Sequence, residues 1–160
     1  MSVKLIAPLA TLLSATSLAD TAQNFEKWSL ICGEQGNCSL SQIVTTDPQG
    51  KNIILGANVN YSLSKEFPVL MIRLPPSTHA NGGVGLKIDT HNPVQIPISQ
   101  CAPAACQTIV KIDEVLLEEM RSGTTMHVAL EIKEGKQLTL PVSLNGFKQG
   151  FEALNKTNRP

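Results

Sequence analysis

The sequence predicts an all-β protein whose antiparallel sheets pack face to face as a sandwich or a barrel. Three observations predict this class. Apolar and polar residues alternate along most of the chain after its N-terminal segment, which is typical of strands with one buried face. Turn-forming residues separate these runs at short intervals, as in sandwiches and barrels. Each run has a single apolar face, which favours antiparallel sheets packed on one side only.

The first element is a predicted secretory signal peptide. Lys4 is the only charge ahead of the cleavage region, an apolar run follows at Leu5–Leu13, and Ser17-Leu18-Ala19 offers small residues for cleavage. The run is too short to cross a membrane, which takes about 20 residues. A retained amphipathic helix is the alternative, but the segment has no polar face at helical spacing. We expect a signal peptide at 1–19, a single β-sandwich domain at 20–160, and a periplasmic or outer-membrane-associated protein.

The charge balance argues against two classes of partner. The chain has 13 Lys and Arg against 13 Asp and Glu, so removal of Lys4 with the signal peptide leaves one net negative charge. Nucleic-acid binders normally carry a basic excess or stripe, and this chain has neither. A polybasic patch for a membrane surface is missing as well. We therefore expect no nucleic-acid partner.

Four cysteines in an exported chain predict two disulfides. The favoured pairing is Cys32–Cys38 with Cys101–Cys106, because both pairs close short loops and meet often during folding. Turn residues lie inside each pair. A Cys32–Cys101 bond is the alternative, and it would stabilise more, at roughly 4.5 kcal/mol against ~2–2.5 kcal/mol for a local bond. Stability alone therefore does not select the local pairing.

The predicted strands follow from the period-two pattern. Residues 53–64 are the best example, because apolar and polar side chains alternate along the whole run with Ile54 as the only exception. Pro97 and Pro141 cannot donate to a sheet ladder, so we expect them on edge strands or at bulges. Turn signals separate the runs, for example Asp47-Pro48-Gln49-Gly50. The other alternating runs are 28–32, 69–74, 84–89, 94–99, 126–132 and 138–144.

Two short helices are predicted in the C-terminal half. Asp113 is placed to cap a helix that extends through Arg121 and ends at Gly123. Ser143 or Asn145 is placed to cap a final helix. Its apolar residues recur at i, i+4 and i+7, at Phe147, Phe151 and Leu154.

Known chemical motifs are missing from the sequence, so we predict no catalytic residue, no cofactor and no metal ligand. Ser62-Leu63-Ser64-Lys65 matches S-x-x-K but lacks the companion motifs of penicillin-binding enzymes. The cysteine spacings are not the C-x-x-C of redox enzymes. The histidines are scattered, although His79 and His91 both lie near predicted turns, where they could converge on a metal. A solvated role is favoured for both, and for His127.

Several short motifs occur in a particular order along the mature chain. They are Trp28 followed by Cys32 and Cys38; Arg73-Leu74-Pro75; Gly83-Val84-Gly85-Leu86-Lys87-Ile88-Asp89; Pro97-Ile98 before Cys101 and Cys106; and Ser143-Leu144-Asn145-Gly146-Phe147 before the final helix. This ordered set resembles the invasion-associated locus B family of bacterial envelope proteins. The resemblance implies an immunoglobulin-like β-sandwich, envelope placement, and a role in host-cell invasion or envelope fitness. Two departures are Ala105, where the family pattern has Gly, and the segment 76–81.

Three functions are compatible with the sequence. The first is a non-enzymatic interaction module of the envelope that binds a protein partner in the envelope or at a host surface. Its candidate contact loops are Pro75–Asn81 and Asp89–Pro93. The second is an accessory subunit or assembly factor of a larger membrane complex, and the third is an enzyme without a recognised motif.

Overall fold

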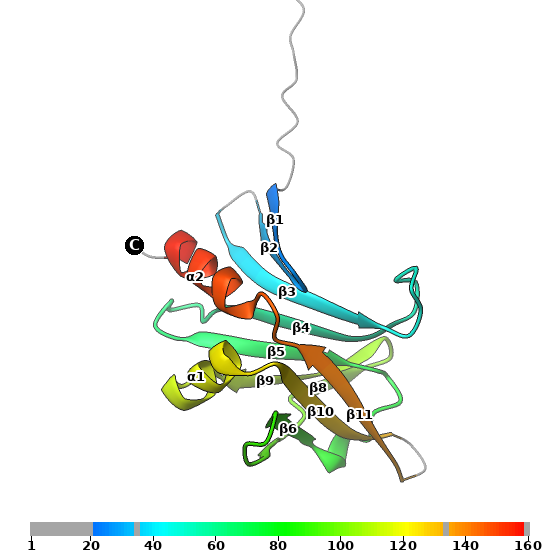
Figure 1. Cartoon of the computed structure of the whole chain (residues 1–160). Coiled ribbons are helices and arrows are strands. Elements are labelled where there is room, and N and C mark those ends of the chain that lie inside the picture. Colours follow the sequence, from blue (N-terminus) through cyan, green and yellow to red (C-terminus); the bar gives the residue numbers. More distant parts are fainter. Residues whose placement is uncertain (1–20, 34–35, 133–134, 159–160) are drawn as a thin grey trace, which may run out of the picture.

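Two antiparallel β-sheets enclose one hydrophobic core (Figure 1). The computed structural model describes residues 21–33, 36–132 and 135–158, so the predicted signal peptide at 1–19 lies outside the described residues. The strands are β1 (Thr21–Phe25), β2 (Trp28–Cys32), β3 (Cys38–Thr45), β4 (Ile53–Tyr61), β5 (Pro68–Leu74), β6 (Val84–Ile88), β7 (Val94–Ile96), β8 (Gln100–Ala102), β9 (Ala105–Lys111), β10 (Thr125–Ile132) and β11 (Lys136–Ser143). The helices are the 3-10 turn η1 (Ala80–Gly82), α1 (Glu114–Ser122) and α2 (Phe147–Asn158).

Strand order follows the chain closely in the larger sheet. This sheet has seven strands in the order β1-β2-β3-β4-β5-β9-β8, and the smaller one has four in the order β11-β10-β6-β7. The strand pairs of the described residues are antiparallel. The predicted all-β sandwich is therefore confirmed. The large sheet is wider than either sheet of an immunoglobulin constant domain, which have four and three strands.

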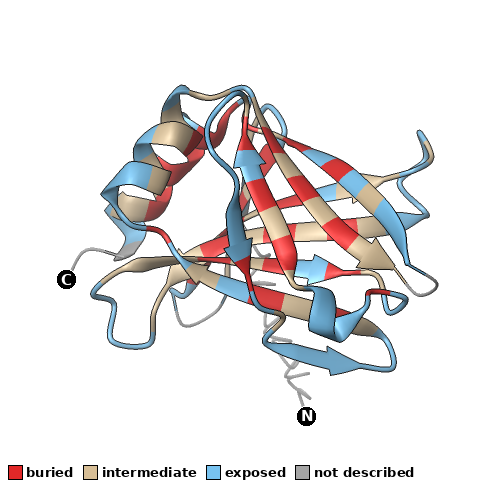
Figure 2. Cartoon of the chain, turned by 90° about the horizontal axis from the view of Figure 1, so that it is seen from below, coloured by how far each residue is buried: buried red, intermediate tan, exposed pale blue. Residues whose placement is uncertain are grey.

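The core follows directly from the alternation in the sequence. Buried residues alternate with more exposed ones along most strands, so that one face of each sheet is covered (Figure 2). Each of the seven predicted alternating runs overlaps a strand, but β4 ends at Tyr61 and β7 at Ile96, before the predicted runs end. Pro141 lies in the edge strand β11, as predicted, whereas Pro97 lies outside the strands, directly after the edge strand β7.

Helix α2 covers the large sheet at β1 to β3 (Figure 1). Its first residue, Phe147, packs edge-on against Trp28 of β2 with ring centroids 5.3 Å apart, and Phe151 stacks on Phe147 one turn later. Gly150 faces Leu40 of β3 so closely that a Cβ there would lie 2.5 Å from a leucine methyl carbon. The helix therefore covers the core in close contact with the sheet.

Within the described residues, no helix has the length and apolar character needed to span a bilayer.

Helix α1 has the predicted caps. The carboxylate of Asp113 accepts a hydrogen bond of 2.9 Å from the backbone nitrogen of Leu116, and Gly123 closes the C-terminus by donating to the Glu119 carbonyl. The predicted cap of α2 is different in detail. The Ser143 hydroxyl accepts from the Asn145 backbone nitrogen, which lies before the helix begins.

Gly146 is required where β11 turns into α2. Its φ of +86° is a left-handed conformation that favours glycine, and a Cβ there would overlap the carbonyl oxygen of Phe25. The neighbouring Asn145 carbonyl accepts a hydrogen bond from the Lys27 backbone nitrogen in the β1–β2 turn. This close approach explains why the Asn-Gly-Phe motif precedes the final helix.

Candidate binding groove on the outer face of the large sheet

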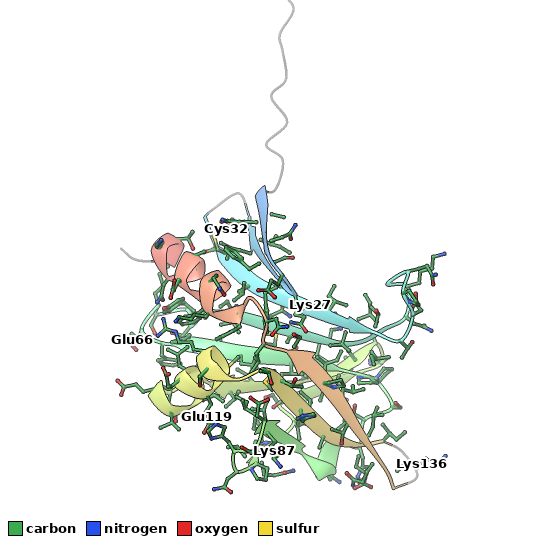
Figure 3. The ribbon with its side chains drawn as sticks, in the orientation of Figure 1. Lys27, Cys32, Glu66, Lys87, Glu119 and Lys136 are labelled. Atoms are coloured by element: carbon green, nitrogen blue, oxygen red, sulfur yellow. A yellow bond between two sulfur atoms is a disulfide. The ribbon has the colours of Figure 1, made fainter. Side chains whose placement is uncertain are left out.

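The two solvent-facing surfaces of the sandwich have different chemistry. Strand register assigns eleven positions to the outer face of the small sheet, none of which carries a large aliphatic side chain. Charges of both signs lie among these positions, including Lys87 on β6 (Figure 3). The eleven are Gly85, Lys87, Gln95, Thr125, His127, Ala129, Glu131, Gln137, Thr139, Pro141 and Ser143.

The outer face of the large sheet carries exposed aliphatic residues among neutral polar ones, and its described strand positions include no carboxylate. Its two charged side chains, Arg73 and Lys111, are both cations. Ile43 keeps 59% of its side chain exposed, and Ile31 and Ile109 keep 41%. Strand register assigns these residues to the face: Ala22, Asn24, Ser29, Ile31, Ser39, Ser41, Ile43, Gly56, Asn58, Asn60, Val69, Met71, Arg73, Gln100, Ala102, Ala105, Gln107, Ile109 and Lys111. Ile31 and Ile43 line one groove together with Ile54, and grouped aliphatic surface of this kind is typical of interaction sites.

A groove of about 560 Å³ lies in one half of this face. Gly56 lies opposite Ile43 on one side and Arg73 on the other, so a position without a side chain falls between two large ones. The Pro75-Pro76 turn and the tip of the β8–β9 hairpin at Ala104-Ala105 also border the groove. The remaining lining residues are Ile31, Ser41, Gln42, Ile53, Ile54, Leu55, Asn58 and Leu74.

Among the described residues that line the groove, Arg73 is the single charged one. It is exposed, and no acceptor among the described residues forms an ion pair or hydrogen bond with its guanidinium. Lys111, at the other half of the face, places its ammonium 4.7 Å from the centre of the Phe67 ring. The guanidinium of Arg73 is therefore the cation of this face that is available for an anionic ligand.

The neutral polar groups of the groove are largely engaged with one another. The Ser41 hydroxyl donates to the Asn58 side-chain oxygen at 2.7 Å. Both ends of the Gln42 amide pair with the backbone of Ser143, at 2.7 Å and 3.0 Å. The groove therefore offers aliphatic contact, the Asn58 amide nitrogen and the Arg73 guanidinium, and few free acceptors.

The disulfides fix the two sides of the groove. The structure joins Cys32 to Cys38 and Cys101 to Cys106, which is the local pairing favoured from the sequence. Each bond links directly opposite residues of a hairpin, β2–β3 in one case and β8–β9 in the other. Ile31 precedes Cys32, and Ala105 precedes Cys106, so each bond holds a lining residue next to it. Cys32 lies at the far end of β2, beside β1 (Figure 3).

The histidines singled out in the sequence occupy separate places. His79 is 3.6 Å from a Glu131 carboxylate oxygen, and His91 is 3.2 Å from one of Glu119. The two therefore pair with different carboxylates and do not form one site. Within the described part of the chain, no group of three or more His, Cys, Asp or Glu side chains is arranged to hold a metal ion.

Asp89 organises the second candidate loop. It adopts a left-handed φ of +43°, and its carboxylate accepts hydrogen bonds from the Thr124 nitrogen, the Thr124 hydroxyl and the Thr125 nitrogen at 2.8–3.0 Å. These bonds hold the pKa of Asp89 below its usual value, and the bond from the Thr124 backbone nitrogen contributes most. This carboxylate has a structural role in tying β6 to the start of β10.

The first candidate loop, Pro75–Asn81, lies beside the groove only through Pro75 and Pro76.

The groove itself was not predicted from the sequence. Two residues in the sequence could have indicated the groove, because each is aliphatic at a position where the alternation expects a polar residue. They are Ile54 in β4 and Ile31 in β2. Ile31 lies on the outer face of the large sheet, and Ile54, at the irregularity of β4, lines the groove.

The fold and this face define a disulfide-linked β-sandwich whose large sheet carries exposed aliphatic residues and no carboxylate at its described outward positions. The chain belongs to the invasion associated locus B (IalB) protein family, whose model matches residues 28–155. The crystal structure of invasion associated protein B from Bartonella henselae is similar in fold, with a TM-score of 0.76 and 21% sequence identity over 85% of this chain and 96% of that chain. No curated protein matches the chain.

Proposed function

We propose that this chain is a non-enzymatic interaction module of the bacterial envelope that binds a protein partner on the outer face of its large sheet. The observation that carries the proposal is the contrast between the two outer faces. One has exposed aliphatic residues and no carboxylate, and the other is polar with mixed charges. Depletion of acidic residues and exposure of aliphatic ones are typical of the centre of a protein interface.

Export to the periplasm is supported by the predicted signal peptide and by two disulfides, which persist in oxidising compartments. Membership of a family described as invasion associated supports a role in host-cell invasion or envelope fitness. The Bartonella henselae protein of similar fold is likewise named as invasion associated.

A binding role is favoured over catalysis by the groove lining. Arg73 is its only ionisable residue, so the described lining contains no carboxylate, histidine or thiol for acid–base or nucleophilic chemistry. The two carboxylate–histidine pairs of the described residues lie outside it.

A pull-down of the tagged protein from its own cells in mild detergent, followed by mass spectrometry, tests the proposal. We expect a partner that is retained by the wild type and lost in Ile109→Glu, which places a carboxylate on the acid-free face. Thr139→Glu is the matched control, because it introduces the same charge at an exposed strand position on the outer face of the other sheet. Loss of the partner in the control alone would contradict the proposed surface.

The second candidate is an accessory subunit or assembly factor of a larger membrane complex. The width of the seven-stranded sheet and the exposure of Ile43 and Ile53, 59% each, favour it, because permanent interfaces are more apolar than transient ones. The same pull-down distinguishes the two. A subunit would co-purify at fixed stoichiometry with membrane proteins, whereas a module would be recovered with a partner at lower and variable yield.

A further inference from the structure

We propose that the groove beside Arg73 binds a free medium-chain fatty acid, with the carboxylate on the guanidinium and the acyl chain along the aliphatic lining. The inference rests on the proposed function, since it names a ligand for one half of the proposed interaction face. The other half, around Met71 and Ile109, is left for the protein partner.

Size and lining fit a single acyl chain. The groove volume of about 560 Å³ is within the range of roughly 300–1,000 Å³ that is usual for small-molecule sites. Most of its lining is aliphatic, and Ile43 and Ile53 are each 59% exposed. Burial of their exposed surface by an acyl chain would be favourable, at about 25 cal/mol per Å² of apolar area.

Charge selects an acid over a neutral or cationic chain. Arg73 has no anionic partner among the described residues, and no outward position of the large sheet carries a carboxylate that would repel an anion. A guanidinium binds a carboxylate through two parallel hydrogen bonds. The Asn58 amide, two residues beyond Gly56 on the same strand, is a further donor on the same face.

Hydrogen-bond capacity argues against an extended peptide in the groove. A peptide brings both donors and acceptors that must be satisfied when buried. The Ser41 hydroxyl and the Gln42 amide are already bonded within the protein, which leaves the groove rich in donors and poor in acceptors. A fatty acid has acceptors at one end only, and the rest of the molecule needs no hydrogen bond.

Isothermal titration calorimetry of the full mature chain with monomeric laurate tests the proposal. We expect laurate to bind and dodecanol and dodecyltrimethylammonium to bind at least tenfold more weakly. Arg73→Gln should weaken laurate binding about tenfold, whereas Lys87→Gln, which removes an exposed cation from the other outer face, should leave it unchanged. Gly56→Leu should abolish binding, because the leucine side chain fills the groove. This variant should still fold, because a Cβ at Gly56 would lie 3.7 Å from its nearest neighbour, the Cβ of Arg73, which is an ordinary contact distance.

Isoleucine methyl NMR shows where the ligand lies. Laurate should shift the methyl signals of Ile43 and Ile54 but not that of Ile109. Equal binding of dodecanol, an equal effect of Lys87→Gln, or the absence of laurate binding would overturn the proposal. Binding to phosphatidylglycerol vesicles without binding of monomeric laurate would also overturn it, in favour of a membrane surface. The proposed function would survive the failure of laurate binding if the pull-down recovered a protein partner with the wild type and lost it with Ile109→Glu.

Discussion

The indole nitrogen of Trp28 donates a 2.9 Å hydrogen bond to the backbone carbonyl of Ser143, 115 residues further along the chain. This bond connects β2 of the large sheet to the end of β11 in the small one. The side chain of Gln42 on β3 reaches the same residue and pairs with both its backbone nitrogen and its carbonyl oxygen. The last strand is thereby fixed where the chain turns into α2.

Loss of the Gln42 contacts should destabilise the protein. In Gln42→Leu the Ser143 carbonyl keeps the Trp28 donor, but the Ser143 backbone nitrogen loses its partner in a partly buried position. We expect a loss of about 2 kcal/mol in the free energy of unfolding. Urea denaturation measures it. Gln137→Leu, at an exposed position of β11, is the control. A comparable loss of stability in this control would show that the pairing of Gln42 with Ser143 is unimportant.

Two glycines with left-handed backbones should differ sharply when each is replaced by alanine. Gly146 and Gly135 have φ values of +86° and +73°, but a Cβ overlaps the Phe25 carbonyl only at Gly146 and meets nothing within 4 Å at Gly135. Gly135→Ala should cost about 1 kcal/mol through backbone strain alone. Gly146→Ala should cost at least about 3 kcal/mol, because the β1–β2 turn must also move. Equal melting temperatures for the two variants would contradict this explanation.

Asp89 should make the stability depend on pH in the acid range. Its folded pKa lies below the unfolded value of about 3.9, chiefly because the Thr124 backbone donates to the carboxylate. Its contribution is therefore fully present above the unfolded pKa and is lost as pH falls through the folded pKa. Urea midpoints from pH 6 to pH 2 should fall less steeply for Asp89→Asn than for the wild type. Parallel curves would show that the carboxylate does not contribute.

Removal of the Cys101–Cys106 bond should affect both stability and the groove. The bond closes a loop with a sequence separation of 5, for which chain entropy gives about 2 kcal/mol. The Cys101→Ser/Cys106→Ser variant should lose about this stability and bind laurate more weakly, because Ala104 and Ala105 are no longer held at the groove. Non-reducing peptide mapping of the wild type should find no peptide that joins Cys32 to Cys101 or Cys106.

The sequence did not predict β1, β3, β8 or β9, and two of these strands, β3 and β9, share a physical cause. β3 and β9 each turn a polar residue toward the core, Gln42 at 8% exposure and Thr108 at 0%. Gln42 is satisfied by Ser143 and Thr108 by the Pro97 carbonyl, both on distant parts of the chain. Such partners become visible only in three dimensions, so the alternation that identified β4 and β10 did not identify these strands.

The groove could not be assembled from the sequence for a similar reason. Ile31, Ile43, Gly56 and Arg73 lie on four different strands, and only the register of β2 to β5 brings them onto one face. Each residue alone is an ordinary surface position. The caps of α1 and the apolar stripe of α2, in contrast, depend on residues within one turn or two of each other, and the sequence predicted them well.

Site-specific photo-crosslinking in the protein's own cells tests the central claim most directly, namely that the outer face of the large sheet is the interaction surface. Benzoylphenylalanine would replace Ile109 on that face or Thr139 on the other. We expect a discrete protein adduct from position 109 and none from position 139. Adducts from position 139 with none from position 109 would contradict the claim, and would place the partner on the small sheet instead.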